Sequence, residues 1–456
     1  MKKIYISLFV LSTLIAGAQT KPADVKYRRS SIHTIIIDDA GLIKADIIKD
    51  AFMKAPIPEK FNDHTLKQRS FDSRKYPLTD AEKGKVSTEG DSKGKAMLRG
   101  VGSSLATAAK GQASAATGGL IDTTNTKYLP QIINKYLVSN NVARDMVAKW
   151  FNRSEKGGFN MTLIGDRGSY NASEMEVNIA KKSARGLASI SDAGVELIGN
   201  TFVVVTRFNY ISKRALYDAA SNPNSASLVK INIQTSPELE AAKQAAIKKA
   251  TEGYVVQTTS YLYQLVWNDS IEAVFYQDLW MDDANIDPKK KEAFDKTNLF
   301  QLKYIGDEKA MANVPMSLKQ KRSDDELVAV ATVNAVDAVI AKLEKSYEVF
   351  RTKTPLLSGD PATAKIGMKE GLEGGDKFEV LEQTLDPKTG KTTYVRVGKI
   401  KVDDSQIWDN RYMADVLQES ETVNDPSTPA KPKVDRTLFK GGSSKFYSGM
   451  LIRQMN

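Results

Sequence analysis

The chain contains no cysteine among its 456 residues, and this absence limits its possible folds more than any other feature. Disulfides, zinc–thiolate centres, iron–sulfur clusters and thiol nucleophiles are all excluded. Buried apolar side chains must therefore stabilise the fold without covalent cross-links. With 41% hydrophobic residues, a chain of this length can form two or three cores of adequate size.

The first residues have the pattern of a secretory signal. Lys2 and Lys3 precede an apolar run over residues 4–15, and Ala16, Gly17 and Ala18 follow it. This order of charged, apolar and small residues predicts cleavage after residue 18. We expect the protein in the periplasm, at the outer membrane or outside the cell. A retained anchor is the minor alternative because a spanning helix needs about 20 apolar residues.

The sequence predicts an α+β, multidomain fold. After the signal peptide (1–18), residues 19–78 form a small N-terminal α/β unit, and residues 79–126 form a flexible Gly/Ala/Ser-rich linker or insertion. An α/β sandwich-like domain with long strands follows over residues 127–353. Glycine-rich turns between short β-branched runs predict a small C-terminal β-barrel over residues 354–456.

Apolar periodicity gives the expected elements of the α/β region. The predicted strands cover residues 30–37, 159–165, 202–205, 254–267 and 300–305, and the predicted helices cover residues 128–152, 173–193, 270–279 and 326–350. Helices that alternate with strands imply a sheet that is at least partly parallel.

Two segments leave a membrane alternative open. Residues 101–121 carry a single charge, Lys110, so they could insert into a membrane, although alanine and glycine supply most of their apolarity. The strands at 254–267 and 300–305 could instead be spanning hairpins. Either feature would fit a pore-forming oligomer.

The sequence gives little support for a known catalytic or cofactor-binding motif. His33 lies in an apolar strand and His64 in a turn, so both are expected to be structural. A calcium loop that begins at Asp283 has Pro288 at its turn position and Phe294 at its bidentate ligand position. Gly441-Gly442-Ser443-Ser444 is followed by Lys445 and does not complete a nucleophile elbow. We therefore expect no catalytic residue, no cofactor and no metal site.

The charge pattern does not favour nucleic acid as a partner. The formal charge is +10, but clusters such as Lys289-Lys290-Lys291 stand among Asp282, Asp283, Asp287 and Glu292. Specific nucleic-acid binding is not expected. An envelope protein, a cell-surface polymer, peripheral membrane association and a homo-oligomer remain open.

Several motifs carry family resemblances. The sequences at 142–151, 196–203 and 407–412 make the whole chain resemble an uncharacterised secreted protein family of Gram-negative gut bacteria. Residues 128–205, with Gly158 to Arg167, resemble the α/β domain of the curli secretion channel family and flagellar assembly protein T. Residues 355–453 resemble the C-terminal β-barrel of that assembly protein.

These observations predict an exported envelope protein with a non-catalytic binding or assembly role at the periplasm or outer membrane. The resemblance implies assembly, and the lack of catalytic motifs agrees with it. A carboxylate-based hydrolase acting on glycan or cell wall is the main alternative, since spacing along a sequence cannot reveal a carboxylate pair. A pore-forming oligomer is the other.

Overall fold

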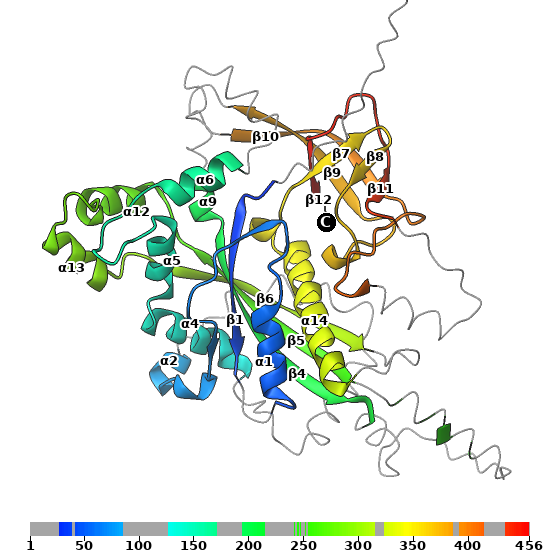
Figure 1. Ribbon diagram of the computed structural model, residues 1–456, viewed down its shortest axis with the longest axis horizontal. Helices are drawn as coiled ribbons and strands as arrows, with labels where there is room; N and C mark the ends of the chain where they lie inside the picture. Colours follow the sequence, from blue (N-terminus) through cyan, green and yellow to red (C-terminus); the bar gives the residue numbers. More distant parts are fainter. Residues whose placement is uncertain are drawn as a thin grey trace, which may run out of the picture.

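The computed structural model describes residues 27–38, 42–84, 126–170, 194–214, 254–314, 323–385, 392–414 and 434–455, with a few residues between 241 and 251. These residues form an α/β sandwich followed by a closed six-stranded β-barrel, so the predicted α+β, multidomain fold is confirmed (Figure 1). Within them, no helix is long and apolar enough to cross a membrane.

One mixed sheet forms the centre of the sandwich, with strand order β2-β1-β4-β5-β6. Strand β1 is parallel to β2, β3 and β4, whereas β4, β5 and β6 follow one another in antiparallel pairs. The expected partly parallel sheet is therefore present. Its strands are β1 (Ser30–Ile37), β2 (Phe61–Asp63), β3 (Ser70–Phe71), β4 (Thr201–Ser212), β5 (Tyr254–Leu265) and β6 (Leu302–Val314).

Helices pack on both faces of the sheet, so β4 at its centre is buried on each face. In β4, Phe202 and Val204 belong to one apolar core, while Val203 and Val205 belong to the other. This alternation follows from the two-residue period of a strand. The first core includes residues of α1 (Ala45–Lys54) and α14 (Asp324–Ser346), and the second includes residues of α4 (Leu129–Ser139), α5 (Val142–Trp150), α6 (Thr162–Tyr170), α9 (Gly194–Gly199), η5 (Phe275–Leu279) and α13 (Pro288–Lys296).

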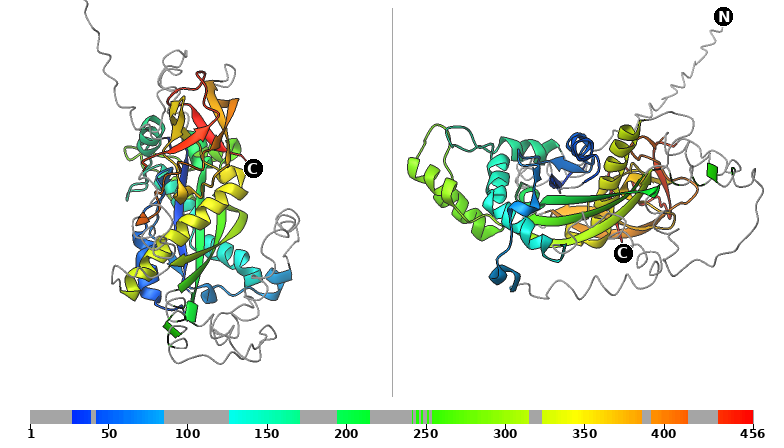
Figure 2. Two further views of the ribbon diagram at one scale, coloured as in Figure 1. Left: turned by 90° about the vertical axis from the view of Figure 1, so that its right-hand side faces the viewer. Right: turned by 90° about the horizontal axis from the view of Figure 1, so that it is seen from below.

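Helix α14 lies between the sheet and the barrel. It begins with a capping box in which Ser323 accepts from the Glu326 amide and the Glu326 side chain accepts from the Ser323 amide. Residues on all sides of this helix are buried, because the sheet, α1 and the barrel segment η7 (Met368–Glu370) all pack on it. Figure 2 shows the barrel and the α12–α13 lobe at opposite ends of the molecule; α12 covers Asp269–Val274.

The described residues of the small N-terminal α/β unit expected over residues 19–78 belong to the same sheet as β4. Strand β1 pairs with β4 over six residues, from Ser31 with Thr201 to Ile36 with Thr206. Helix α1 packs against α14 in the same core. The short strands β2 and β3 both border β1. The strands on either side of residue 78 therefore belong to one sheet.

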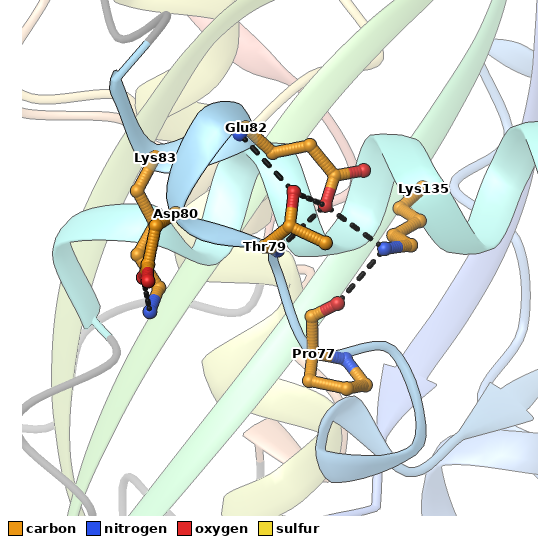
Figure 3. Close-up of polar contacts among 6 residues, drawn as sticks. All are labelled: Pro77, Thr79, Asp80, Glu82, Lys83 and Lys135. Carbon is orange, nitrogen blue, oxygen red and sulfur yellow. Dashed lines mark hydrogen bonds and ion pairs between the residues drawn. The ribbon is translucent and has the colours of Figure 1, made fainter.

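The α-helices described on either side of residues 85–125 are α2 (Asp80–Gly84) and α4, and they contact each other. Helix α2 has Thr79 and Glu82 as its capping pair, and Lys135 of α4 donates to the Glu82 carboxylate at 3.0 Å and to the Pro77 carbonyl at 2.8 Å (Figure 3). The Gly/Ala/Ser-rich stretch, expected as a linker or an insertion, thus begins and ends within one domain. Residues 85–125, including the stretch considered for membrane insertion, lie outside the described residues.

The barrel closes in the order β10-β11-β8-β7-β12-β9 around its own apolar core. Gly371, with a φ of +68°, ends η7 and lies against Ala341 of α14, so a left-handed turn joins the barrel closely to the helix. The strands are β7 (Thr354–Gly359), β8 (Ala362–Ala364), β9 (Lys377–Leu385), β10 (Thr392–Val402), β11 (Thr437–Lys440) and β12 (Leu451–Gln454).

The structure corrects one predicted strand. Residues 159–165 were expected to be extended, but α6 begins at Thr162, whose amide donates to the Asn160 side chain. Asn at this position favours a helix start over strand pairing. The helices predicted at 128–152, 270–279 and 326–350 and the strands at 254–267 and 300–305 are present, with shifted ends. The helix predicted over residues 173–193 lies outside the described residues.

Candidate functional site

A cavity lies at the end of the sheet where its parallel strands begin. Parallel strands start at a common edge, so the residues just before β1, β2 and β4 gather there. These residues are Arg29, Lys60 and Asn200. Helix α14 ends at the same edge, and the chain passes from it into the barrel. The topology therefore forms this cavity from both domains; we call it the junction cavity.

The junction cavity has a volume of about 180 Å³. Five of its side chains are cationic and one is a carboxylate. Its lining residues are Tyr27, Arg29, Ser30, Lys60, Asn200, Glu348, Val349, Arg351, Thr352, Lys353 and Arg453. The sandwich contributes the residues up to 200, the connection that includes η6 (Glu348–Phe350) contributes the next five, and β12 of the barrel contributes the last.

Carboxylates outside the lining hold two of the cations. The Lys60 ammonium pairs with Glu344, whose side chain is 7% exposed and also accepts from the Thr352 hydroxyl at 2.7 Å. Arg453 donates to Glu379 at 2.7 Å and lies 3.7 Å from Glu348. These pairs fix the positions of both cations at the wall.

Arg351 caps the end of α14. Its guanidinium donates to the main-chain carbonyls of Glu344 at 3.1 Å, Lys345 at 2.9 Å and Gln454 at 3.2 Å. The first two carbonyls belong to the last turns of the helix, which carry partial negative charge. Burial lowers the pKa of Arg351. One side chain thus closes the helix and ties it to β12.

Aromatic rings hold the remaining cations in place. The Tyr27 and Tyr394 hydroxyls share a hydrogen bond of 2.5 Å, which joins the start of the sandwich to β10. The Lys353 ammonium lies 3.9 Å from the Tyr394 ring centre, and the Arg29 guanidinium lies 5.3 Å from that of Tyr27. Ring faces attract cations, so these contacts orient both groups at the cavity.

The cavity has the chemistry of a site for an anion. Five of its lining side chains are cationic, and Glu348 is the one carboxylate among the lining residues. Arg and Lys donate without accepting, which suits phosphate or carboxylate oxygens. Among the lining residues there is no histidine and only one carboxylate.

Both histidines are buried in hydrogen-bonded positions away from the cavity lining. His33 pairs with the Gln68 carbonyl through Nε2 and accepts from the Leu66 amide through Nδ1. His64 pairs with the Met146 carbonyl at 3.0 Å, and its Nδ1 lies 3.1 Å from Arg167. Burial lowers the pKa of His33 to about 4 and that of His64 well below its ordinary value. Both are neutral at physiological pH.

The segment considered as a calcium loop forms hydrogen-bonded turns. Asp282 accepts from the Ala284 and Asn285 amides, and Asp283 accepts from the Ser154 hydroxyl at 2.6 Å. Asp287 caps α13. In the part of the chain that the structure describes, no three histidine, aspartate or glutamate side chains group as metal ligands. Ser443 likewise takes part in a turn, in which its carbonyl accepts from the Phe446 amide at 2.9 Å.

Sequence reasoning did not identify the cavity residues. The sequence contains one relevant signal: a basic residue stands just before each of two strands. Arg29 precedes β1, and Lys60 precedes β2. That signal becomes informative only when the strands are known to be parallel and adjacent. The other three cations lie near Arg29 and Lys60 only because the barrel packs against the sandwich; they are Arg351, Lys353 and Arg453.

Comparison with known proteins adds no assignment. No protein-family model matches the chain, and no curated protein matches it significantly. The resemblances to the curli secretion channel family and flagellar assembly protein T stay predictions.

Proposed function

We propose that this protein is an exported, non-catalytic binding protein of the cell envelope that holds an anionic group of its partner in the junction cavity. The observation that carries the proposal is the set of five cations, with a single carboxylate, around one cavity formed by both domains. The signal pattern at residues 1–18 supports export. An assembly role fits, because a partner held there contacts the sandwich and the barrel together.

The hydrolase alternative has less support. Asp337 is the carboxyl group whose pKa burial raises to about 7, a value suited to a general acid. Its side chain is 8% exposed, however, and lies against Lys369 rather than lining the cavity. Glu348 is the single carboxylate of the lining. A glycosidase needs two carboxyl groups on either side of one bond.

Cell fractionation combined with site-specific cross-linking tests the proposal. A photoreactive residue at Val349, which is 50% exposed and lines the cavity, should capture an anionic envelope component. Val138 of α4, 67% exposed and outside the lining, is the matched control position. We expect mature protein in the envelope fraction and a product from residue 349 that competing anions abolish.

Two results would contradict the proposal. Mature chain confined to the cytoplasm would exclude an envelope role. Equal products from residues 349 and 138, insensitive to competing anions, would show that the cavity does not select the partner.

A further inference from the structure

We propose that the α12–α13 lobe of one copy of this chain docks on strand β10 in the barrel of a second copy. The lobe presents carboxylates beside an exposed aromatic side chain, and β10 presents cations among exposed valines. The junction cavity takes no part in this contact, so the inference goes beyond the proposed function and is tested separately from it.

The lobe is acidic although the whole chain is basic. Residues 268–297 contain eight carboxylates and four lysines, whereas the chain has a formal charge of +10. Lys296, one of these lysines, already pairs with Glu292. Asp269 of α12 and Asp278 of η5 are exposed, and neither forms an ion pair with another residue in the described part of the chain. The lobe therefore has carboxylates available for a cationic partner surface.

Tyr276 supplies an exposed aromatic side chain beside these carboxylates. It is 36% exposed, and its hydroxyl lies 3.5 Å from the sulfur of Met161, which is 45% exposed. Asp269 and Glu272 precede it by seven and four residues, a spacing that places side chains along one side of a helix. An exposed tyrosine bordered by charge is typical of the centre of a protein–protein contact. We call Met161, Asp269, Glu272, Tyr276 and Asp278 the lobe face.

Strand β10 supplies exposed cations in the barrel. Arg396, Lys399 and Lys401 are all exposed. None of the three forms an ion pair with another residue that the structure describes. These cations are therefore available to the carboxylates of a partner.

Nearby carboxylates do not neutralise β10. Asp403 and Asp404 both pair with a lysine of β11, and Glu379 pairs with an arginine of β12. Glu382 is the other carboxylate of β9 that lies opposite β10. One carboxylate beside three exposed cations leaves the strand basic.

Strand β10 also extends beyond the closed part of the barrel. It pairs with β9 along most of its length but with β11 only through its last two residues, and Figure 1 shows it reaching to one side of the other barrel strands. A β-bulge between Arg396 and Gly398 interrupts the pairing at Val397. Val397 is 41% exposed and Val395 is 50% exposed. We call the exposed residues Val395, Arg396, Val397, Lys399 and Lys401 the barrel face.

Charge and position together point to a contact between two copies. Figure 1 shows the lobe and the barrel on different sides of the central sheet, so the two faces of one molecule lie apart. The lobe face is negative and the barrel face is positive, so the two attract each other. Two barrel faces, or two lobe faces, would bring like charges together, which disfavours contact between like faces. A lobe-to-barrel contact is heterologous, and it joins a different surface of each copy.

Sedimentation velocity of the purified mature chain measures this assembly. At low salt we expect species larger than one chain, and we expect them to dissociate as NaCl rises from about 0.05 M to about 0.5 M, because salt screens exposed charges. A chain that stays monomeric at concentrations up to about 0.5 mM would overturn the inference, because a specific contact would be populated there. Assembly that salt leaves unchanged would overturn it as well.

Charge reversals locate the two faces. Arg396→Glu with Lys399→Glu should weaken assembly by more than about tenfold, because carboxylates would then face carboxylates. Asp269→Lys with Asp278→Lys should weaken it as strongly from the lobe side. All four changes in one chain restore opposite charges, so this chain should assemble again. The four side chains are exposed, so folding should not depend on them.

Lys67→Glu with Lys75→Glu is the matched control. Both lysines are exposed in the sandwich outside the two faces, and their reversal changes the net charge as much as the barrel-face reversal does. The control should assemble like the parent. An equal loss of assembly in the control would overturn the contact. So would a chain with all four reversals that circular dichroism shows to be folded but that stays monomeric.

Discussion

At the residue scale, the two buried histidines make the fold sensitive to acid. The folded protein keeps His33 and His64 neutral, because burial lowers the pKa of each. The unfolded chain protonates both near pH 6.5. As the pH falls below about 6.5, the unfolded state therefore binds more protons and the folded state loses stability. The contribution of His33 ends near pH 4, where the folded protein also protonates this side chain.

Urea unfolding at a series of pH values measures this dependence. Two protons give a slope of up to about 2.7 kcal/mol per pH unit between about pH 6 and about pH 5. His33→Gln should reduce the slope by up to about 1.4 kcal/mol per unit, whatever its effect on absolute stability. An identical slope in the variant would show that His33 does not titrate as its burial requires.

Asp337 has the opposite effect on the pH dependence of stability from that of the histidines. Burial raises its pKa to about 7, and its Oδ2 accepts no hydrogen bond. The unfolded carboxyl ionises near pH 4, so stability falls as the pH rises from about 4 to about 7. Asp337→Asn removes this loss. We expect the variant to be more stable than the parent by up to about 4 kcal/mol at pH 8, and the difference should vanish near pH 4. A variant less stable at pH 8 would show that the Lys369 pair outweighs burial.

At the element scale, two glycines in regular elements have opposite expected effects. A Cβ at Gly359, the last residue of β7, would lie 1.9 Å from the Phe446 carbonyl oxygen, whereas one at Gly165 of α6 meets nothing within 4 Å. Gly359→Ala should therefore destabilise the barrel by about 2 kcal/mol or more through overpacking. Gly165→Ala should stabilise by up to about 1 kcal/mol, because alanine favours a helix. Thermal unfolding of both variants checks the pair, and similar shifts would contradict the packing at Phe446.

Elements were predictable where a periodic pattern was long. The alternation in β5 and the apolar turns of α14 identify both elements from sequence alone. The strand expected at 159–165 failed because a short apolar run does not distinguish a strand from the first turn of a helix. Strand partners were also inaccessible: β1 precedes β4 by more than 160 residues, and their pairing depends on the cores above and below the sheet.

At the scale of the whole molecule, polar contacts join the barrel to the sandwich. Lys345 of α14 donates to the Gly371 carbonyl at 2.7 Å and lies 3.3 Å from Asp376. The Tyr27–Tyr394 hydrogen bond and the Arg453–Glu348 pair lie beside the junction cavity. Such a junction has to be assembled from residues far apart in sequence, so its cavity could not be predicted before the domains were placed. An anion bound there would contact both domains and strengthen their association.

Replacing Arg351 should uncouple the unfolding of the barrel from that of the sandwich. Its guanidinium joins the end of α14 to the Gln454 carbonyl of β12, so Arg351→Met leaves helix and strand carbonyls without their charged donor. We expect a loss of about 2 kcal/mol or more, and calorimetry should resolve barrel and sandwich unfolding as two transitions where the parent shows one. Arg396→Met, at an exposed position of β10, should stay within about 0.5 kcal/mol of the parent. A single unshifted transition in Arg351→Met would mean that apolar packing alone couples the domains.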